Sequence, residues 1–153
     1  MQQMSEEMWM RHANPWSVWT RFAAIPAAML AVWSRVWIGW WSLIPIALVV
    51  LWLFLNVFVF SPVTTPRNWA SKGIYGEQLW LSKRSELPGH YAVVQRWLII
   101  LGMAGMVLLA WGLFRLHIWL SLLGMVVLIL AQLWRIDRFS TLYERYEEQG
   151  FQL

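Results

Sequence analysis

The chain has 153 residues, of which 59% are hydrophobic and 13% are charged. About a quarter of the residues of a soluble domain are charged, so this composition excludes an ordinary soluble protein and predicts a membrane protein. The net charge of +4 is what anionic lipid and the positive-inside rule favour, and we expect no nucleic-acid partner. The absence of cysteine excludes disulfides, thiolate metal sites and covalently attached haem.

The N-terminal residues predict two helices separated by a turn. Ser5 can cap a short helix that lies against the membrane surface. Asn14 and Pro15 then predict the start of a longer helix, because asparagine accepts a hydrogen bond from an exposed N–H and proline has no N–H to leave unpaired. The first fourteen residues are therefore interpreted as an interfacial arm.

Two long apolar blocks contain no Asp or Glu, namely Phe22–Phe60 and Trp97–Trp134. Each block is about twice the roughly 20 residues that one helix needs to cross the hydrocarbon, so each predicts a helical hairpin. We therefore expect an all-α fold, a polytopic transmembrane bundle of four helices. The predicted spans are residues 20–36, 41–60, 97–113 and 117–134.

In this interpretation the whole chain, 1–153, is a single membrane domain. Its predicted parts are the interfacial arm (1–14), a first hairpin (15–60), a cytoplasmic loop (61–96), a second hairpin (97–134) and a cytoplasmic tail (135–153). The loop carries two short segments of helical character, one capped by Asn68 before Gly73 and one after it. We interpret them as one or two interfacial helices under the bundle.

The basic residues predict the orientation in the membrane. Of the twelve Lys and Arg residues, all but Arg35 and Arg115 lie in the arm, the loop or the tail, or, for Arg21, at the adjoining start of the first span. Four spans bring these three regions to one side, and the positive-inside rule makes that side cytoplasmic. We expect a multi-pass protein of a prokaryotic cytoplasmic (inner) membrane, with both termini in the cytoplasm.

Small residues and amides inside the spans predict helix packing. Ala23, Ala27 and Ala31 form a stripe at i, i+4 spacing that allows the close approach of another helix, within the chain or between copies. Asn56 and Gln132 lie near the cytoplasmic ends of spans two and four. An amide pair there would bridge the two spans with a hydrogen bond worth about 1 kcal/mol.

Several polar residues of the predicted cytoplasmic face are candidates for a ligand site. They are His12, Arg21, Glu77 and His90, with Arg11 and Arg67 as anion contacts. Two histidines and a carboxylate can bind a metal, but no H-x-x-x-H or E-x-x-H spacing supports this, and we expect no metal. Haem between two transmembrane histidines is disfavoured because none lies at mid-membrane, so we expect no cofactor. The spacing leaves open whether His12, Glu77 and His90 converge.

Three stretches of the chain carry a resemblance to a known family: "RHANPWSVWTR", "WSRVWIGWW" and "NWASKGIYGEQLWL". Together they resemble a family of small bacterial and archaeal integral membrane proteins of unknown function. The resemblance covers about residues 8–135. It implies a polytopic membrane protein, and it implies no activity and no functional residue.

Sequence signatures and acidic residues that are missing from the chain or its spans reduce the number of possible functions. The chain has no serine-hydrolase, P-loop or dinucleotide signature, and the spans have no acidic residue to carry a proton. The missing signatures favour a non-enzymatic protein, either an accessory subunit of a larger membrane complex or a homo-oligomer in contact with membrane lipid. In that case Ala27→Leu would disrupt its assembly. The alternative is an enzyme or ligand-binding protein for an amphiphile (lipid, quinone or haem) at the cytoplasmic interface, whose ligand His12→Ala would release.

Overall fold

The computed structural model describes residues 5–84 and 87–148, and within these ranges the chain is helical and contains no β-strand. The predicted all-α class is confirmed. The helices are α1 (Glu6–His12), α2 (Pro15–Trp33), α3 (Arg35–Ile38), the 3-10 helix η1 (Gly39–Ser42), α4 (Leu43–Val59), α5 (Trp69–Ser82), α6 (Gly89–Phe114) and α7 (Ile118–Glu148).

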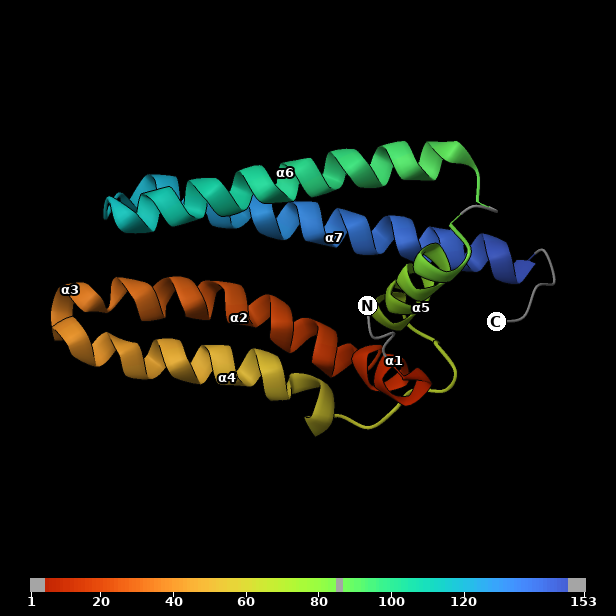
Figure 1. Ribbon diagram of the computed structural model, residues 1–153, viewed down its shortest axis with the longest axis horizontal. Helices are drawn as coiled ribbons and strands as arrows, with labels where there is room; N and C mark the ends of the chain where they lie inside the picture. The colour runs from red at the N-terminus through yellow and green to blue at the C-terminus, as the bar shows by residue number, and fades with distance from the viewer. Residues whose placement is uncertain (1–4, 85–86, 149–153) are drawn as a thin grey trace.

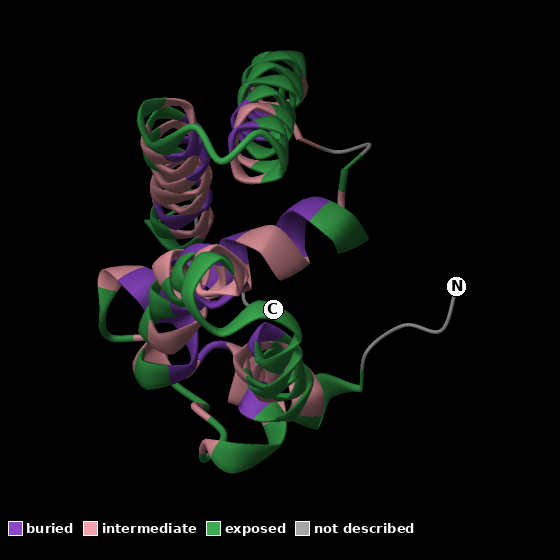
Figure 2. Ribbon diagram, turned by 90° about the vertical axis from the view of Figure 1, so that its left-hand side faces the viewer, coloured by how far each residue is buried: buried purple, intermediate pink, exposed green. Residues whose placement is uncertain are grey.

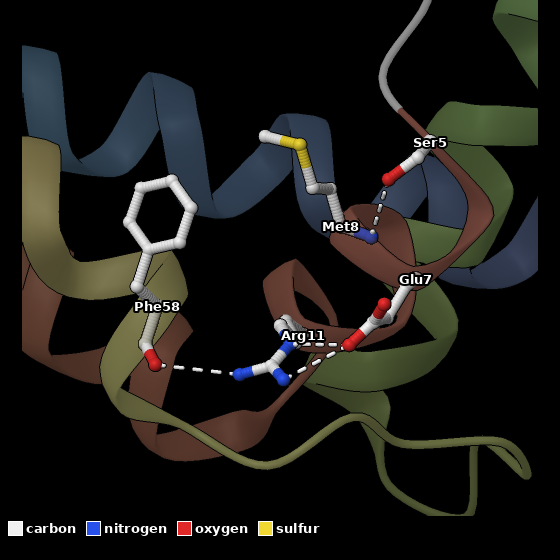
Figure 3. A network of polar contacts seen from close by, with 5 residues as sticks. All are labelled: Ser5, Glu7, Met8, Arg11 and Phe58. Carbon is white, nitrogen blue, oxygen red and sulfur yellow. Dashed lines mark hydrogen bonds and ion pairs between the residues drawn. The ribbon is translucent and has the colours of Figure 1, made fainter.

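The first two helices begin at the caps that the sequence predicts. The Ser5 hydroxyl accepts a hydrogen bond from the Met8 N–H at 3.3 Å, and the Asn14 side chain accepts from the Trp16 N–H at 3.0 Å. α1 is then fastened to the end of α4, because Arg11 donates to Glu7 in its own helix and to the carbonyl of Phe58 at 3.3 Å (Figure 3). That carbonyl lies in the last turn of α4, where no partner exists within the helix.

α2 and α4 lie side by side and antiparallel (Figure 1). The chain reverses between them through α3 and η1, and Gly39 adopts φ 56° and ψ −129°, a backbone conformation open in practice only to glycine. Asn56 of α4 is fully buried and joins the two helices: its carbonyl oxygen accepts from the Ser17 hydroxyl, and its amide donates to Thr20 Oγ1 at 2.8 Å. The predicted Asn56–Gln132 bridge is therefore wrong, because both polar atoms of the Asn56 amide bond to α2.

α6 and α7 form a second antiparallel pair (Figure 1), packed closely through glycines. A Cβ atom placed on Gly124 would lie 2.2 Å from the backbone nitrogen of Leu109, and one on Gly112 would lie 2.5 Å from that of Ser121. Both helices extend beyond the predicted spans: α6 begins at Gly89, inside the predicted loop, and α7 continues to Glu148, through the predicted tail. The second pair is thus longer than its apolar block.

The two pairs meet mainly at their ends. At the end that carries α3, η1 and the α6–α7 turn, which we call the turn end, Arg35 donates to the carbonyls of Leu113 and Phe114 (3.1 Å for Phe114). At the opposite end, called the polar end, α5 lies between the pairs, and α1 packs against α5 and the end of the α2–α4 pair (Figure 1). In the described part of the chain, α4 packs against neither α6 nor α7.

Three helical segments are long and apolar enough to cross a membrane: Pro15–Val59, Gly89–Phe114 and Ile118–Glu148. Their buried residues face neighbouring helices, whereas their outer faces are exposed (Figure 2). Large apolar side chains cover those outer faces, including Phe54 (73% exposed) and Val107 (66%). Exposed apolar surface of this extent is what a lipid environment requires and fits the prediction of a membrane protein.

Candidate functional site

A cavity of about 220 Å³ opens at the polar end, among α1, α2, α5 and α7. Its polar lining comes from His12, Arg21, Glu77, Gln132 and Arg135. Its remaining lining is apolar and includes two residues of α2, Phe22 and Ile25, that follow Arg21 toward the turn end. The cavity therefore combines charged and apolar side chains, and Phe22 and Ile25 lie deeper along α2 than Arg21.

Two glycines of α5 bring Glu77 to this cavity. A Cβ atom on Gly76 would lie 1.9 Å from the carbonyl oxygen of Phe139, and one on Gly73 would lie 2.4 Å from the Ile136 side chain. Only glycine at these positions lets the α5 backbone approach α7 this closely. α5 is accordingly one continuous helix through Gly73, and Glu77, the residue after Gly76, faces Arg135.

Arg21 and His12 form the α1–α2 side of the cavity. The Arg21 guanidinium donates to the His12 carbonyl at 2.9 Å and to the Ser17 carbonyl at 3.0 Å, and a third nitrogen lies 2.8 Å from His12 Nδ1. Burial, together with the positive charge of Arg21, lowers the pKa of His12 to about 3. The imidazole is therefore neutral at physiological pH.

Arg135 and Glu77 form the opposite side. Arg135 donates to a Glu77 carboxylate oxygen at 3.3 Å and to Gln132 Oε1 at 3.1 Å. Both side chains of the ion pair are largely buried, at 22% and 28% exposed. Burial raises the pKa of Glu77 above its usual value, against the opposing effect of the Arg135 and Arg21 charges.

The side chains of the site offer hydrogen bonds to a polar ligand. Within the described ranges no three His, Asp or Glu side chains are grouped so that they could hold a metal ion. The lining residues include neither a hydroxyl nor a thiol that could act as a nucleophile. Two guanidinium groups, a neutral imidazole and an amide instead offer hydrogen-bond donors beside an apolar wall.

The structure brings together three of the predicted candidates, His12, Arg21 and Glu77, and places the other three elsewhere. His90 lies at the start of α6, where its ring is 4.3 Å from that of Tyr91. Arg11 bonds to Glu7 and to the end of α4, and Arg67 lies in the segment between α4 and α5. None of these three lines the cavity.

Two polar lining residues lay outside the candidate cluster that the sequence predicts. From the sequence, Gln132 is expected to pack between helices, and Arg135 is one of the basic residues of the tail. The helical spacing in the sequence could have identified both residues. Four lining residues of α7 lie at i, i+3, i+4 and i+7 on one helical face, namely Gln132, Arg135, Ile136 and Phe139. The predicted span ends at residue 134, so this face runs from the span into the predicted tail.

The alanine stripe of α2 is divided by the structure. Ala31 is buried, whereas Ala23 and Ala27 are exposed along an apolar groove between α2 and α4. Association of a second helix with Ala23 and Ala27 stays a prediction, which Ala27→Leu tests.

Comparison with known proteins identifies a family without a described activity. A model described as a family of unknown function, DUF6653, matches residues 2–151. The match includes every residue that lines the cavity. No curated protein and no solved structure matches the chain.

Proposed function

The chain belongs to DUF6653, a family of unknown function, and we propose from its geometry that it is a membrane protein that binds an amphiphile at its cytoplasmic face. The observation that carries this proposal is the mixed lining of the cavity, in which Arg21, Glu77 and Arg135 stand beside apolar side chains such as Phe22 and Ile25. An amphiphile combines the same two properties, since a polar head is joined to an apolar chain.

The proposed topology has four crossings. Pro15–Val59 is 45 residues long and reverses direction at α3 and η1, so α2 and α4 each cross once, and α6 and α7 supply the other two crossings. Both termini and α5 then lie on the side that holds most of the basic residues, which the positive-inside rule makes cytoplasmic.

Exposed tryptophans support the proposal that the cavity lies at the level of the lipid headgroups. At the polar end Trp16, Trp97 and Trp134 are 70%, 65% and 55% exposed, and at the turn end Trp40 and Trp119 are 87% and 73% exposed. Such belts lie at headgroup level in membrane proteins. Because Arg135 follows Trp134 directly, the proposed depth puts Arg135 near the lipid headgroups, while Ile25, one turn of α2 beyond Arg21, lies closer to the hydrocarbon.

The volume of the cavity supports binding of a headgroup and not of a whole lipid. About 220 Å³ is less than the roughly 300–1,000 Å³ of ordinary small-molecule pockets. The head and the first carbons of an amphiphile would fill the cavity, and the rest of its chain would follow the apolar face of α2. The lining that the structure describes has no hydroxyl or thiol, and its guanidinium groups and amide support the binding of a headgroup.

Filling the cavity tests the proposal. We expect the wild-type protein, purified in mild detergent, to carry a co-purifying amphiphile in native mass spectrometry. Ile25→Trp is expected to abolish that mass, because the larger indole fills space in the cavity that Ile25 lines. Leu30→Trp is the matched control, since Leu30 is on the same helix but 63% exposed and outside the lining. A wild-type protein without any bound amphiphile, or equal retention by both variants, would contradict the proposal.

A further inference from the structure

We propose that the amphiphile has a negatively charged head, a carboxylate or phosphate, which Arg21 and Arg135 bind in competition with Glu77. This inference rests on the proposed function and adds the chemical class of the ligand. It follows from the charges of the cavity, the partners of Arg21 and the geometry of the Arg135–Glu77 contact.

The charges that line the cavity do not balance. Among its lining residues, Arg21 and Arg135 are positive, Glu77 is the one acidic side chain, and His12 is a neutral imidazole. The cavity therefore has a net charge of +1 when Glu77 is ionised and +2 when it is neutral. A partly buried excess charge beside an apolar wall is costly unless a counter-ion joins it, so the site favours an anion.

Arg21 carries the uncompensated charge. Its donors face the carbonyls of Ser17 and His12 and the imidazole of His12, all of which are uncharged. It forms no ion pair within 4.0 Å with a carboxylate of the described chain. These contacts hold the guanidinium in place at the cavity without neutralising it, which is the arrangement of an anion site.

Arg135 is held less firmly than a closed ion pair would hold it. One nitrogen contacts Glu77 at 3.3 Å, longer than the 2.7–2.9 Å of a strong charge-assisted hydrogen bond. Its Nε is buried without a hydrogen-bond partner in the part of the chain that the structure describes. An incoming anion would therefore replace a weak contact, and the Glu77 carboxylate is its competitor.

Four ligands that share an alkyl chain and differ in their head group test which head-group charge the cavity prefers. The probes are palmitate, hexadecyl phosphate, hexadecanol and hexadecylamine, each titrated into the full-length protein in nanodiscs of zwitterionic lipid, with binding measured by native mass spectrometry. We expect the two anions to bind at least about tenfold more tightly than the alcohol, and the amine to bind most weakly. The ratio of palmitate to hexadecyl phosphate identifies the source, a free fatty acid or a phosphorylated lipid.

Single substitutions test whether Glu77 and Arg21 weaken or strengthen the binding of palmitate. Glu77→Gln removes the competitor and is expected to tighten palmitate binding by about three- to tenfold. Arg21→Gln is expected to abolish the preference for palmitate over hexadecanol. Arg138→Gln is the matched control, because Arg138 is also on α7, pairs with Asp137 and lies outside the lining, and it should leave both affinities unchanged.

The possible failures can be told apart. Equal binding of palmitate and hexadecanol to the wild type would overturn the anionic head and leave the amphiphile site standing. Absence of binding for all four probes would overturn the proposed function as well. Weaker palmitate binding by Glu77→Gln would overturn the competition, even if Arg21→Gln failed to fold.

Discussion

At the scale of single residues, the cavity holds an ionisable side chain in its uncharged form. His12 is partly buried beside a permanent positive charge, and its pKa is lowered to about 3 for both reasons. The guanidinium of Arg21 is meanwhile fixed by two backbone carbonyls. The α1–α2 corner thus depends on a neutral imidazole, which makes the corner sensitive to acid.

We expect the fold to lose stability on acidification through His12. The unfolded chain binds the proton with a pKa near 6.5 and the folded protein near 3, so the stability is fully present above pH 6.5 and falls below it. The loss at pH 5 is about 2 kcal/mol, since one pKa unit corresponds to about 1.4 kcal/mol. Thermal unfolding in detergent between pH 7 and pH 5 measures it.

Substitution of single histidines tests whether His12 causes the pH dependence of stability. His12→Gln is expected to flatten the dependence on pH, whereas His90→Gln, an exposed histidine on α6, should keep it. Parallel curves for wild type and His12→Gln would show that another group titrates.

At the scale of elements, the contact between α5 and α7 places Glu77 opposite Arg135. The contact depends on Gly73 and Gly76, whose missing side chains let two helix backbones touch. Apolar residues seal the same interface, with Leu79 and Trp80 of α5 packed against Phe139 and Leu142 of α7. The position of the Glu77–Arg135 pair thus follows from helix packing and not from a loop.

Gly76→Ala is expected to separate α5 from α7. The new methyl group would lie 1.9 Å from the Phe139 carbonyl oxygen, and a backbone atom cannot move without its helix. We expect a loss of about 1–3 kcal/mol in stability and the loss of amphiphile binding. Gly89→Ala is the control, because a Cβ atom there meets nothing within 4 Å. Thermal unfolding and ligand titration compare the two, and equal melting temperatures would contradict the close approach.

At the scale of the whole molecule, two antiparallel pairs are joined at both ends. Arg35 links α3 to the carbonyls that end α6, and α5 with the cavity residues joins the pairs at the polar end. α4 remains in contact with α2 but with neither helix of the second pair, within the residues described. In this described part, the two pairs are therefore held together through α2, α3 and α5 and not through α4.

The proposed topology predicts the reactivity of single cysteines, which can be introduced without interference because the chain has none. Glu6→Cys and Thr64→Cys should be labelled by a membrane-impermeant maleimide from the same side, and Trp40→Cys from the other. All three positions are exposed. If Pro15–Val59 crossed only once, Glu6→Cys and Thr64→Cys would react from opposite sides.

The sequence by itself determined the features that depend on neighbouring residues. Ser5, Asn14 and Asn68 cap helices because their side chains reach N–H groups two or three residues away. The apolar blocks predicted where helices form, since burial in lipid depends on composition over about 20 residues. The shared location of His12 and Arg21 is also local, because nine residues separate them across one turn.

The tertiary structure alone decided which distant residues meet. Glu77 and Arg135 are 58 residues apart and face each other only because two glycines allow α5 to cross α7. Asn56 bonds to Ser17 and Thr20 and not to Gln132, since α4 packs on α2 and not on α7. Periodicity predicts which face of a helix is apolar, but the crossing of two helices depends on how both surfaces fit, and no single segment contains that information.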